Sequence, residues 1–210
     1  MSGAAGLILA AGASTRMGRP KQLLPVGEGI LLDRILGEAL RSDLDVVVLV
    51  LGHQATEIRE HLVTDLSHPK LRIRVNKNYL EGISSSIITG LLEAESACDH
   101  VMILLADMPY ITAGVINLLL QRYLDSGLPL GAIQTGGRRS HPVIISRSLY
   151  PRLHQLRGDT GAKNLFSENP DLICLVAPEK DYRDMDVDTP GDYQELAGAL
   201  NLPDSDPDSG

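Results

Sequence analysis

Short apolar runs alternate with longer amphipathic segments along most of the chain. The runs at residues 46–51 and 101–105 are apolar on both faces, which is typical of strands that helices cover on both sides. The segments between such runs place apolar residues at helical spacing. Strands are therefore predicted at residues 7–10, 45–52, 71–76, 100–107, 130–135, 141–146 and 172–177, and helices at 31–40, 55–66, 84–95 and 112–124.

This alternation predicts one α/β domain. A strand, a crossover helix and a second strand in series form a right-handed unit with parallel strands, so we expect a Rossmann-like three-layer sandwich with a mostly parallel sheet. Thr112 lies at an expected helix start, and "SGLP" at 126–129 is a helix stop. The domain is expected to span residues 1–200, and the acidic tail 201–210, rich in Pro and Ser, to be disordered.

Composition narrows the class of protein. Aromatic residues make up only 3% of the 210 residues and Trp is absent, so we expect a core of Leu, Ile, Val and Ala. The formal net charge of -8 disfavours a nucleic-acid-binding surface. No apolar run approaches membrane-spanning length and no signal peptide is evident, which favours a cytoplasmic protein without a membrane partner. Cys98 and Cys174 are far apart and are expected to be apolar core residues.

The loop after the first predicted strand combines small and basic residues. Ligands of open α/β sheets bind at the carboxyl ends of the strands, which is where this loop lies. Small side chains would let backbone N–H groups face an anion. Neither GxxxxGK[ST] nor GxGxxG is present, and an ordinary strand-to-helix turn with exposed basic residues would have the same composition. The loop contains Ala10, Ala11, Gly12, Ala13, Ser14, Arg16, Arg19 and Lys21.

Acidic residues are predicted at the same edge of the sheet. Asp107 directly follows a buried strand, and "RDMDVDTPGDY" places Asp186 and Asp188 two residues apart, on one face of an extended chain. A carboxylate at a strand end also serves as a helix cap, and Thr189 with Pro190 looks like a helix start. Mg²⁺ in nucleotide sites needs only one or two carboxylates, so Asp107 with either late aspartate could hold it.

Six motifs in order along the chain resemble one known family. They resemble the nucleotidyltransferases of molybdenum cofactor biosynthesis, the MobA-like NTP transferases, which have the nucleotide-diphospho-sugar transferase-like fold. The motifs are "LAAGASTRMGRPK" (9–21), "GISSSIITGL" (82–91), "LLADMP" (104–109), "HPV" (141–143), "GDTGA" (158–162) and "DVDTPGDY" (186–193).

The resemblance implies a nucleoside triphosphate bound by the first loop and by the segment 82–90. It implies a divalent cation, Mg²⁺ or Mn²⁺, held by Asp107 with Asp188, or with Asp186 as the second choice. Lys21 and Arg16 would contact the α-phosphate and the leaving pyrophosphate, so Lys21, Arg16 and Asp107 are the expected catalytic residues. The expected nucleotide-binding residues are Leu9, Ala10, Ala11, Gly12, Ser14, Arg16, Lys21, Gly82, Ser84, Ser85, Ser86 and Gly90.

Within the family, "LAAG" resembles the branch that uses CTP, whereas "LAGG" is more typical of the branch that uses GTP. The implied acceptor is the molybdopterin cofactor, with a molybdenum hydroxylase as the recipient of the product. Acceptor-binding residues would be His141, Gly158, Asp159 and Gly161. Ser140 and Lys163 depart from the family pattern, which has Gly and Arg there. Lys163 keeps the charge but loses the planar fork of Arg.

Three other functions fit the same residues. A sugar-1-phosphate nucleotidyltransferase would share the loop, fold and metal but use another acceptor, and a guanylyltransferase would differ in the base. A non-catalytic carrier of the molybdenum cofactor is the third alternative. A carrier has no need for Arg16, Lys21, Asp107 and a late aspartate together, which favours an enzyme.

Overall fold

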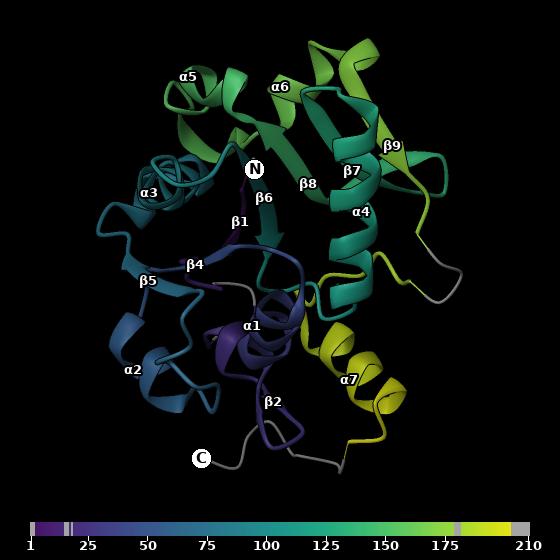
Figure 1. The fold of residues 1–210 in the computed structure, drawn as a ribbon. Helices are drawn as coiled ribbons and strands as arrows, with labels where there is room; N and C mark the ends of the chain where they lie inside the picture. The colour runs from purple at the N-terminus through teal and green to yellow at the C-terminus, as the bar shows by residue number, and fades with distance from the viewer. Residues whose placement is uncertain (1–2, 15–16, 18, 179–181, 203–210) are drawn as a thin grey trace.

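A seven-stranded sheet crosses the molecule in the order β5-β4-β1-β6-β8-β7-β9 (Figure 1). The computed structural model describes residues 3–14, 17, 19–178 and 182–202. The predicted tail 201–210 lies almost wholly outside the described residues. The strands are β1 (Ala4–Ala10), β4 (Val46–Leu51), β5 (Leu71–Val75), β6 (His100–Leu105), β7 (Leu130–Thr135), β8 (Arg138–Ser146) and β9 (Ile173–Val176), and a separate two-stranded hairpin pairs β2 (Pro25–Val26) with β3 (Gly29–Ile30).

Four of the six strand pairings in the large sheet are parallel, and both antiparallel pairings involve β8. β5, β4, β1 and β6 are mutually parallel, and β9 is parallel to β7, whereas β8 is antiparallel to both β6 and β7. The reversal arises at Gly136 and Gly137, whose φ angles of 53° and 76° form a tight hairpin turn. This turn leaves no room for a crossover helix. The mostly parallel sheet is confirmed, and β8 is its exception.

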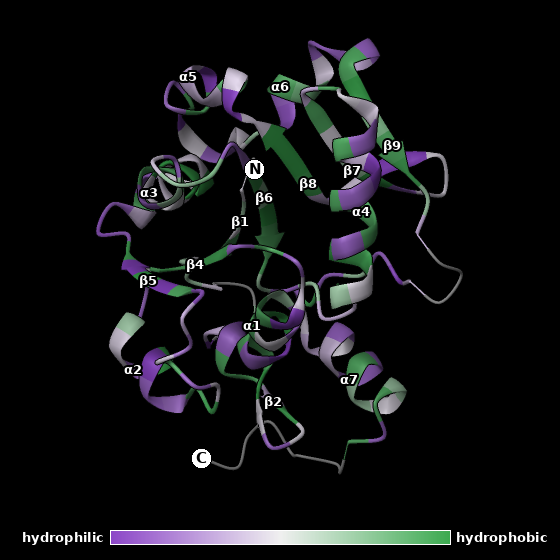
Figure 2. Cartoon of the chain, in the orientation of Figure 1, coloured by the Kyte–Doolittle hydropathy of each residue, from purple (hydrophilic) through white to green (hydrophobic). Residues whose placement is uncertain are grey.

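Helices cover both faces of the sheet, so the predicted three-layer sandwich is confirmed. Ile8 of β1 packs in a core cluster with α1, α2 and α4, whereas Leu7 and Leu9 pack on the other face with α3, α5 and α6. In Figure 2, β6 and β8 are hydrophobic along most of their length, and the covering helices alternate between hydrophilic and hydrophobic stretches. The helices are α1 (Leu31–Arg41), α2 (Ala55–His61), α3 (Ile83–Ala94), α4 (Ala113–Ser126), α5 (Tyr150–Leu153), α6 (Lys163–Ser167) and α7 (Pro190–Ala199).

Local chemistry sets the ends of the helices. Thr112 caps α4 by accepting a hydrogen bond from Val115 N, and Gly127 ends it with φ 65°, as predicted. The expectation that α2 reaches residue 66 is wrong, because the chain leaves the helix at Leu62. The N–H groups of Val63 and Thr64 donate to the carboxylate of Asp33 instead of continuing the helix.

Helix α7 forms a third small core with the segment after the first loop. Thr189 and Asp192 make a reciprocal capping box at its start, which agrees with the helix start predicted there. Leu196 is fully buried against Leu24 and Leu31. Figure 1 shows α7 beside α1, at the carboxyl-end side of β1 and β6. This packing brings α7 next to the segment that follows the first loop, although the two are far apart in the sequence.

The remaining observations concern the core residues, the two cysteines and the hydrophobicity of the helices. The cores consist almost entirely of Leu, Ile, Val and Ala, as expected. Cys98 is buried and Cys174 half-buried, and both are free thiols. None of the helices that the described residues form is long and apolar enough to cross a membrane.

Candidate functional site

A cavity that adjoins the predicted first loop lies beside β1, where the order of the strands in the sheet reverses. β1 has β4 on one side and β6 on the other, so the loops after β1 and β6 diverge at their carboxyl ends, where open α/β sheets bind ligands. A cavity of about 490 Å³ occupies this place. It is lined by Leu9, Ala11, Gly12, Ala13, Ser14, Lys21, Gln22, Tyr79, Leu80, Gly82, Ile83, Ser86, Leu105, Ala106, Asp107 and Asp159.

The first loop is held from inside by Gln22. Its buried amide Nε2 donates to the carbonyls of Ala10 and Gly12, each at 3.1 Å, and its Oε1 accepts from Ser14 Oγ at 3.3 Å. Ser14 has φ 51° and accepts a hydrogen bond from Lys21 N at 3.1 Å. The loop is therefore folded around its own polar side chains. A Cβ on Gly12 would meet nothing within 4 Å, so Gly12 borders open space.

Lys21 joins two carboxylates that come from distant parts of the chain. Its Nζ donates to Asp107 Oδ2 at 2.5 Å and to Asp188 Oδ1 at 2.6 Å. Burial alone would lower the pKa of Lys21, but the charges of Asp107 and Asp188 and the hydrogen bonds to them together raise it above its usual value. Lys21 is therefore an ammonium ion at neutral pH. Arg16, the other predicted cation of this loop, lies outside the described residues.

The two late aspartates lie in different surroundings. Val187 is fully buried between them, and its N–H donates to the carbonyl of Asp107 at 2.9 Å. Asp188 contacts Lys21, whereas Asp186 is exposed. The structure thus brings together Lys21, Asp107 and Asp188.

These carboxylates are suited to a hard divalent cation. Asp107 Oδ1 is buried and has no hydrogen-bond partner among the described residues, which leaves it available as a ligand. No group of three His, Cys, Asp or Glu side chains with metal-binding geometry occurs within the described part of the chain. A cation here would take two carboxylates and its remaining ligands from phosphate or water, as Mg²⁺ commonly does.

The residues at the start of α3 line two different hollows of the protein. Gly82 and Ser86 line the cavity, but Ser84 and Ser85 face a separate hollow on the outer side of the helix. Asn76 is buried and donates to the hydroxyls of both Ser85 and Ser86, at 2.8 and 3.0 Å. Gly90 lies away from the cavity, where a Cβ would come within 3.1–3.3 Å of side chains on β4 and β1. Its place in the structure is a close helix–sheet contact.

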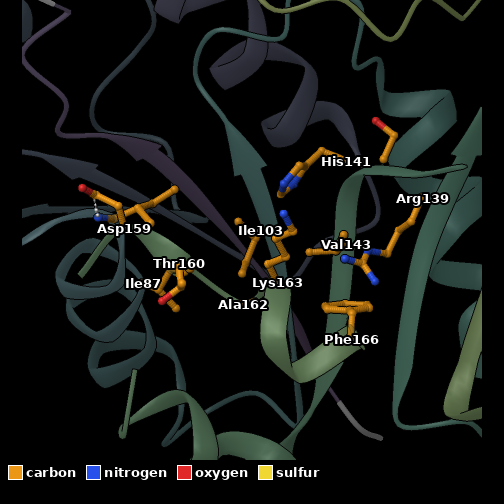
Figure 3. Close-up of a pocket in the computed structure, with 13 residues that line it drawn as sticks. Ile87, Ile103, Arg139, His141, Val143, Asp159, Thr160, Ala162, Lys163 and Phe166 are labelled. Carbon is orange, nitrogen blue, oxygen red and sulfur yellow. Dashed lines mark hydrogen bonds between the residues drawn. The ribbon is translucent and has the colours of Figure 1, made fainter. Parts of the chain in front are cut away.

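A second cavity of about 310 Å³ adjoins the first (Figure 3). His141 projects into it from a bulge in β8, where residues 141 and 142 have no partner on β7. Burial is the main cause that lowers the pKa of His141, so its imidazole is neutral at pH 7. Arg139 lies with its guanidinium carbon 4.7 Å from the centre of the Phe166 ring. Lys163, one of the two departures from the family pattern, also lines this cavity.

The two cavities share Ile83 and Asp159 in their walls. Asp159 Oδ1 accepts a hydrogen bond from Ile83 N, the first residue of α3. Gly161 lines the second cavity, whereas Gly158 lines the hollow outside α3. A Cβ on Gly82, which has φ 96°, would come within 2.6 Å of Gly158 backbone atoms, so these turns are in direct contact.

Three functional candidates were missed in the sequence, although each carries a signal. Gln22 is a polar residue that lies between Lys21 and the apolar pair Leu23 and Leu24. Asn76 follows the carboxyl end of β5, just as Asp107 follows the carboxyl end of β6. Arg139 lies two residues before His141, which the family resemblance implies to be an acceptor-binding residue.

The fold and this site together define an α/β nucleotidyltransferase. The chain belongs to the family of the MobA-like NTP transferase domain, whose model matches residues 6–172. The family resemblance drawn from the six motifs is therefore confirmed, and nucleotidyl transfer is the activity of this family.

Similarity to individual proteins extends over almost the whole chain. The purine catabolism protein PucB of Bacillus subtilis is 29% identical over 93% of this chain and 97% of its own. The molybdenum cofactor cytidylyltransferase of Escherichia coli is 26% identical over 89% and 92%. Among solved structures, a homologue of Mycobacterium tuberculosis Rv0371c from Mycobacterium sp. strain JC1 has a TM-score of 0.81 at 28% identity, covering 94% of this chain and 96% of that one. Rv0371c itself, in complex with manganese, has a TM-score of 0.77 at 23% identity, covering 94% and 100%.

Proposed function

We propose that this protein is a cytidylyltransferase that moves CMP from CTP to the terminal phosphate of molybdopterin and releases pyrophosphate. The observation that carries the proposal is Lys21 bridging Asp107 and Asp188 at the edge of the larger cavity. Full-length similarity to the cytidylyltransferase of Escherichia coli supports this acceptor, and "LAAG" at residues 9–12 supports CTP.

In the proposed reaction a phosphate oxygen of the acceptor forms a bond to the α-phosphorus of CTP. The bond from that phosphorus to the bridging oxygen breaks, and pyrophosphate leaves with the electron pair. No covalent intermediate with the protein is needed, so positioning and charge stabilisation supply the rate enhancement. Lys21 holds the α-phosphate as its charge develops, the first loop presents backbone N–H groups to the other phosphates, and Arg16 holds the leaving pyrophosphate.

Asp107 and Asp188 are the proposed ligands of Mg²⁺ or Mn²⁺. The unpartnered Asp107 Oδ1 and the all-oxygen donor set support this assignment, and manganese is present in the solved structure of Rv0371c. The cation would neutralise charge on the phosphates of the nucleotide. His141 and the second cavity would bind the acceptor, and a molybdenum hydroxylase would receive the product.

The first experiment is a calorimetric titration with CTP, GTP, ATP and UTP in the presence of Mg²⁺. We expect selective binding of CTP. Asp107→Asn and Asp188→Asn should abolish metal-dependent binding, whereas the matched control Asp186→Asn should not. Lys21→Ala should reduce turnover far more than it weakens CTP binding, because Lys21 acts on charge that develops in the transition state.

Other outcomes assign other functions. Preference for GTP would place the protein with guanylyltransferases. CTP binding with turnover on a sugar 1-phosphate but not on molybdopterin would identify a sugar nucleotidyltransferase. If no nucleotide binds, the proposal is wrong and a carrier of the cofactor becomes the better explanation.

A further inference from the structure

Two cationic side chains lie in the wall of the second cavity. Arg139 and Lys163 both line it, and no carboxylate among the described residues pairs with either side chain. The one carboxylate in the wall, Asp159, accepts a hydrogen bond from Ile83 N at the joint with the first cavity. The whole chain has a net charge of -8, so a cationic pocket here runs against the general charge of the molecule.

Arg139 is more constrained than Lys163. Lys163 is exposed, whereas the guanidinium of Arg139 is half-buried and lies over the Phe166 ring, which is itself almost fully buried. Packing over an aromatic ring stabilises a guanidinium and leaves its edge N–H groups able to donate hydrogen bonds. Figure 3 shows Arg139 above the ring of Phe166 at one side of the cavity. The contact with the ring thus holds the guanidinium of Arg139 at the wall of the cavity.

The imidazole of His141 lines the same cavity as Arg139. His141 Nδ1 is buried and has no hydrogen-bond partner among the described residues. Because the imidazole is neutral, it can hydrogen-bond to a ligand without adding charge. A ligand that fits this wall therefore carries negative charge for Arg139 and a polar group for His141.

We propose that Arg139, held on the ring of Phe166, is an acceptor-recognition residue that binds the phosphate of a phosphorylated acceptor. A planar guanidinium matches phosphate with two parallel hydrogen bonds, which a neutral acceptor could not accept with the same strength. The inference rests on the proposed function for the identity of the reaction, and it adds the residue that selects the acceptor's chemical class. Arg139 and Phe166 act on the acceptor alone, because neither lines the first cavity.

Inorganic phosphate tests the binding step without any acceptor or nucleotide. We would follow backbone amide resonances of residues 161–166 by NMR during a phosphate titration at constant ionic strength. Arg139→Met should weaken phosphate binding about 10- to 100-fold, the loss expected for charge-assisted hydrogen bonds. Arg138→Met is the matched control, because Arg138 is exposed and lies 3.7 Å from Asp184 instead. Equal phosphate affinity in Arg139→Met and in the unmodified protein would overturn the proposal.

Two conservative variants distinguish a loss of phosphate binding from a loss of folding. Arg139→Lys keeps the charge but loses the fork, and Phe166→Leu keeps the guanidinium but removes the ring beneath it. Both should bind phosphate more weakly than the unmodified protein while retaining a cooperative thermal transition. If both folded variants bind phosphate as tightly as the unmodified protein, Arg139 is not a recognition residue.

Kinetics separate this inference from the proposed function. With molybdopterin as acceptor, Arg139→Lys should raise the KM for the acceptor at least about tenfold and leave the KM for CTP unchanged. Failure of the unmodified protein to use molybdopterin would refute the proposed acceptor but not the phosphate result. An equal rise in both KM values would refute the role assigned to Arg139.

Discussion

Gln22 shows how one buried polar side chain can shape a loop. A buried amide must find partners for its donors and its acceptor, and Gln22 finds them on Ala10, Gly12 and Ser14. The carbonyls it engages are thereby turned inward. Backbone N–H groups of the same loop are then free to face the cavity.

Gln22→Ala is expected to destabilise the protein by about 2 kcal/mol, because it leaves the buried carbonyls of Ala10 and Gly12 without a donor. Urea denaturation measures the change. Gln121→Ala, at an exposed position of α4, is the control and should change stability by less than about 0.5 kcal/mol. A loss no larger than that of the control would show that the loop does not depend on Gln22.

We expect the free energy of unfolding to depend on pH through His100. Burial lowers its pKa, and burial also raises the pKa of Tyr123 to about 12, so the Tyr123 hydroxyl stays protonated. A hydrogen bond of 3.0 Å joins this hydroxyl to His100 Nδ1. The unfolded chain takes up the proton first, at a pKa of about 6.5. Stability should therefore fall as the pH drops through about 6.5 toward the lower pKa of the folded state.

The measurement is the denaturant midpoint of unfolding at pH 7.5 and pH 5.5. His100→Gln should be less stable than the unmodified protein at pH 7.5, because its amide replaces the ring that packs on Tyr123. It should then lose less stability between the two pH values, since one protonation is removed. An identical pH dependence in both proteins would refute this role for His100.

At the scale of elements, hydrophobic periodicity predicted all seven strands of the large sheet and the four longest crossover helices. It could not say which of three consecutive serines faces the cavity. Successive residues on a helix point about 100° apart, so Ser84, Ser85 and Ser86 project in different directions. The structure places only Ser86 in the larger cavity. That choice depends on how α3 packs on the sheet, which a local pattern does not contain.

β8 shows a second limit of local pattern. "HPVIIS" indicates a strand, but its direction is set by the preceding Gly136–Gly137 turn, and the bulge that aims His141 is set by pairing with β7. Pairing across strands is a long-range property of the chain. The sequence could therefore nominate His141 as a candidate but not place it beside Arg139 and Phe166.

We expect a methyl group added at Gly82 to destabilise the protein. Gly82→Ala must adopt φ 96° and bring its Cβ within 2.6 Å of the Gly158 backbone, so we expect a loss of at least about 2 kcal/mol. The control is Gly37→Ala within α1, where the added Cβ would touch only the far end of Arg41. This control should be neutral or stabilising by up to about 1 kcal/mol. Equal stability of the two variants in urea denaturation would contradict the tight contact.

At the scale of the whole molecule, the carboxylate pair depends on contacts between segments that are far apart in the sequence. Lys21 and Asp188 are 167 residues apart in sequence. Asp188 directly precedes the capping box of α7, and α7 is fixed by Leu196 against Leu24 and Leu31. The geometry of the charged site is therefore supported by an apolar contact beyond the residues that the family model matches.

Leu196→Ala is expected to cost about 2–5 kcal/mol, because it opens a cavity in this third core. It should also weaken Mn²⁺ binding, measured by electron paramagnetic resonance, since Asp188 loses part of its support. Leu92→Ala is the control, because Leu92 is 59% exposed and lies on α3. Unchanged Mn²⁺ affinity in a destabilised Leu196→Ala protein would separate α7 packing from the carboxylate pair.

The shared wall between the two cavities has a consequence for how this family can diversify. Apart from Asp159, the lining of the larger cavity comes from residues 9–107, whereas the charged side chains of the smaller one come from residues 139–163. In the proposed reaction, separate stretches of the chain would therefore face the two reactants. Exchanging residues 136–166 between relatives should transfer preference for one reactant while the other is retained. Changes in residues 136–166 could then alter the acceptor that such a protein uses while its nucleotide stays the same.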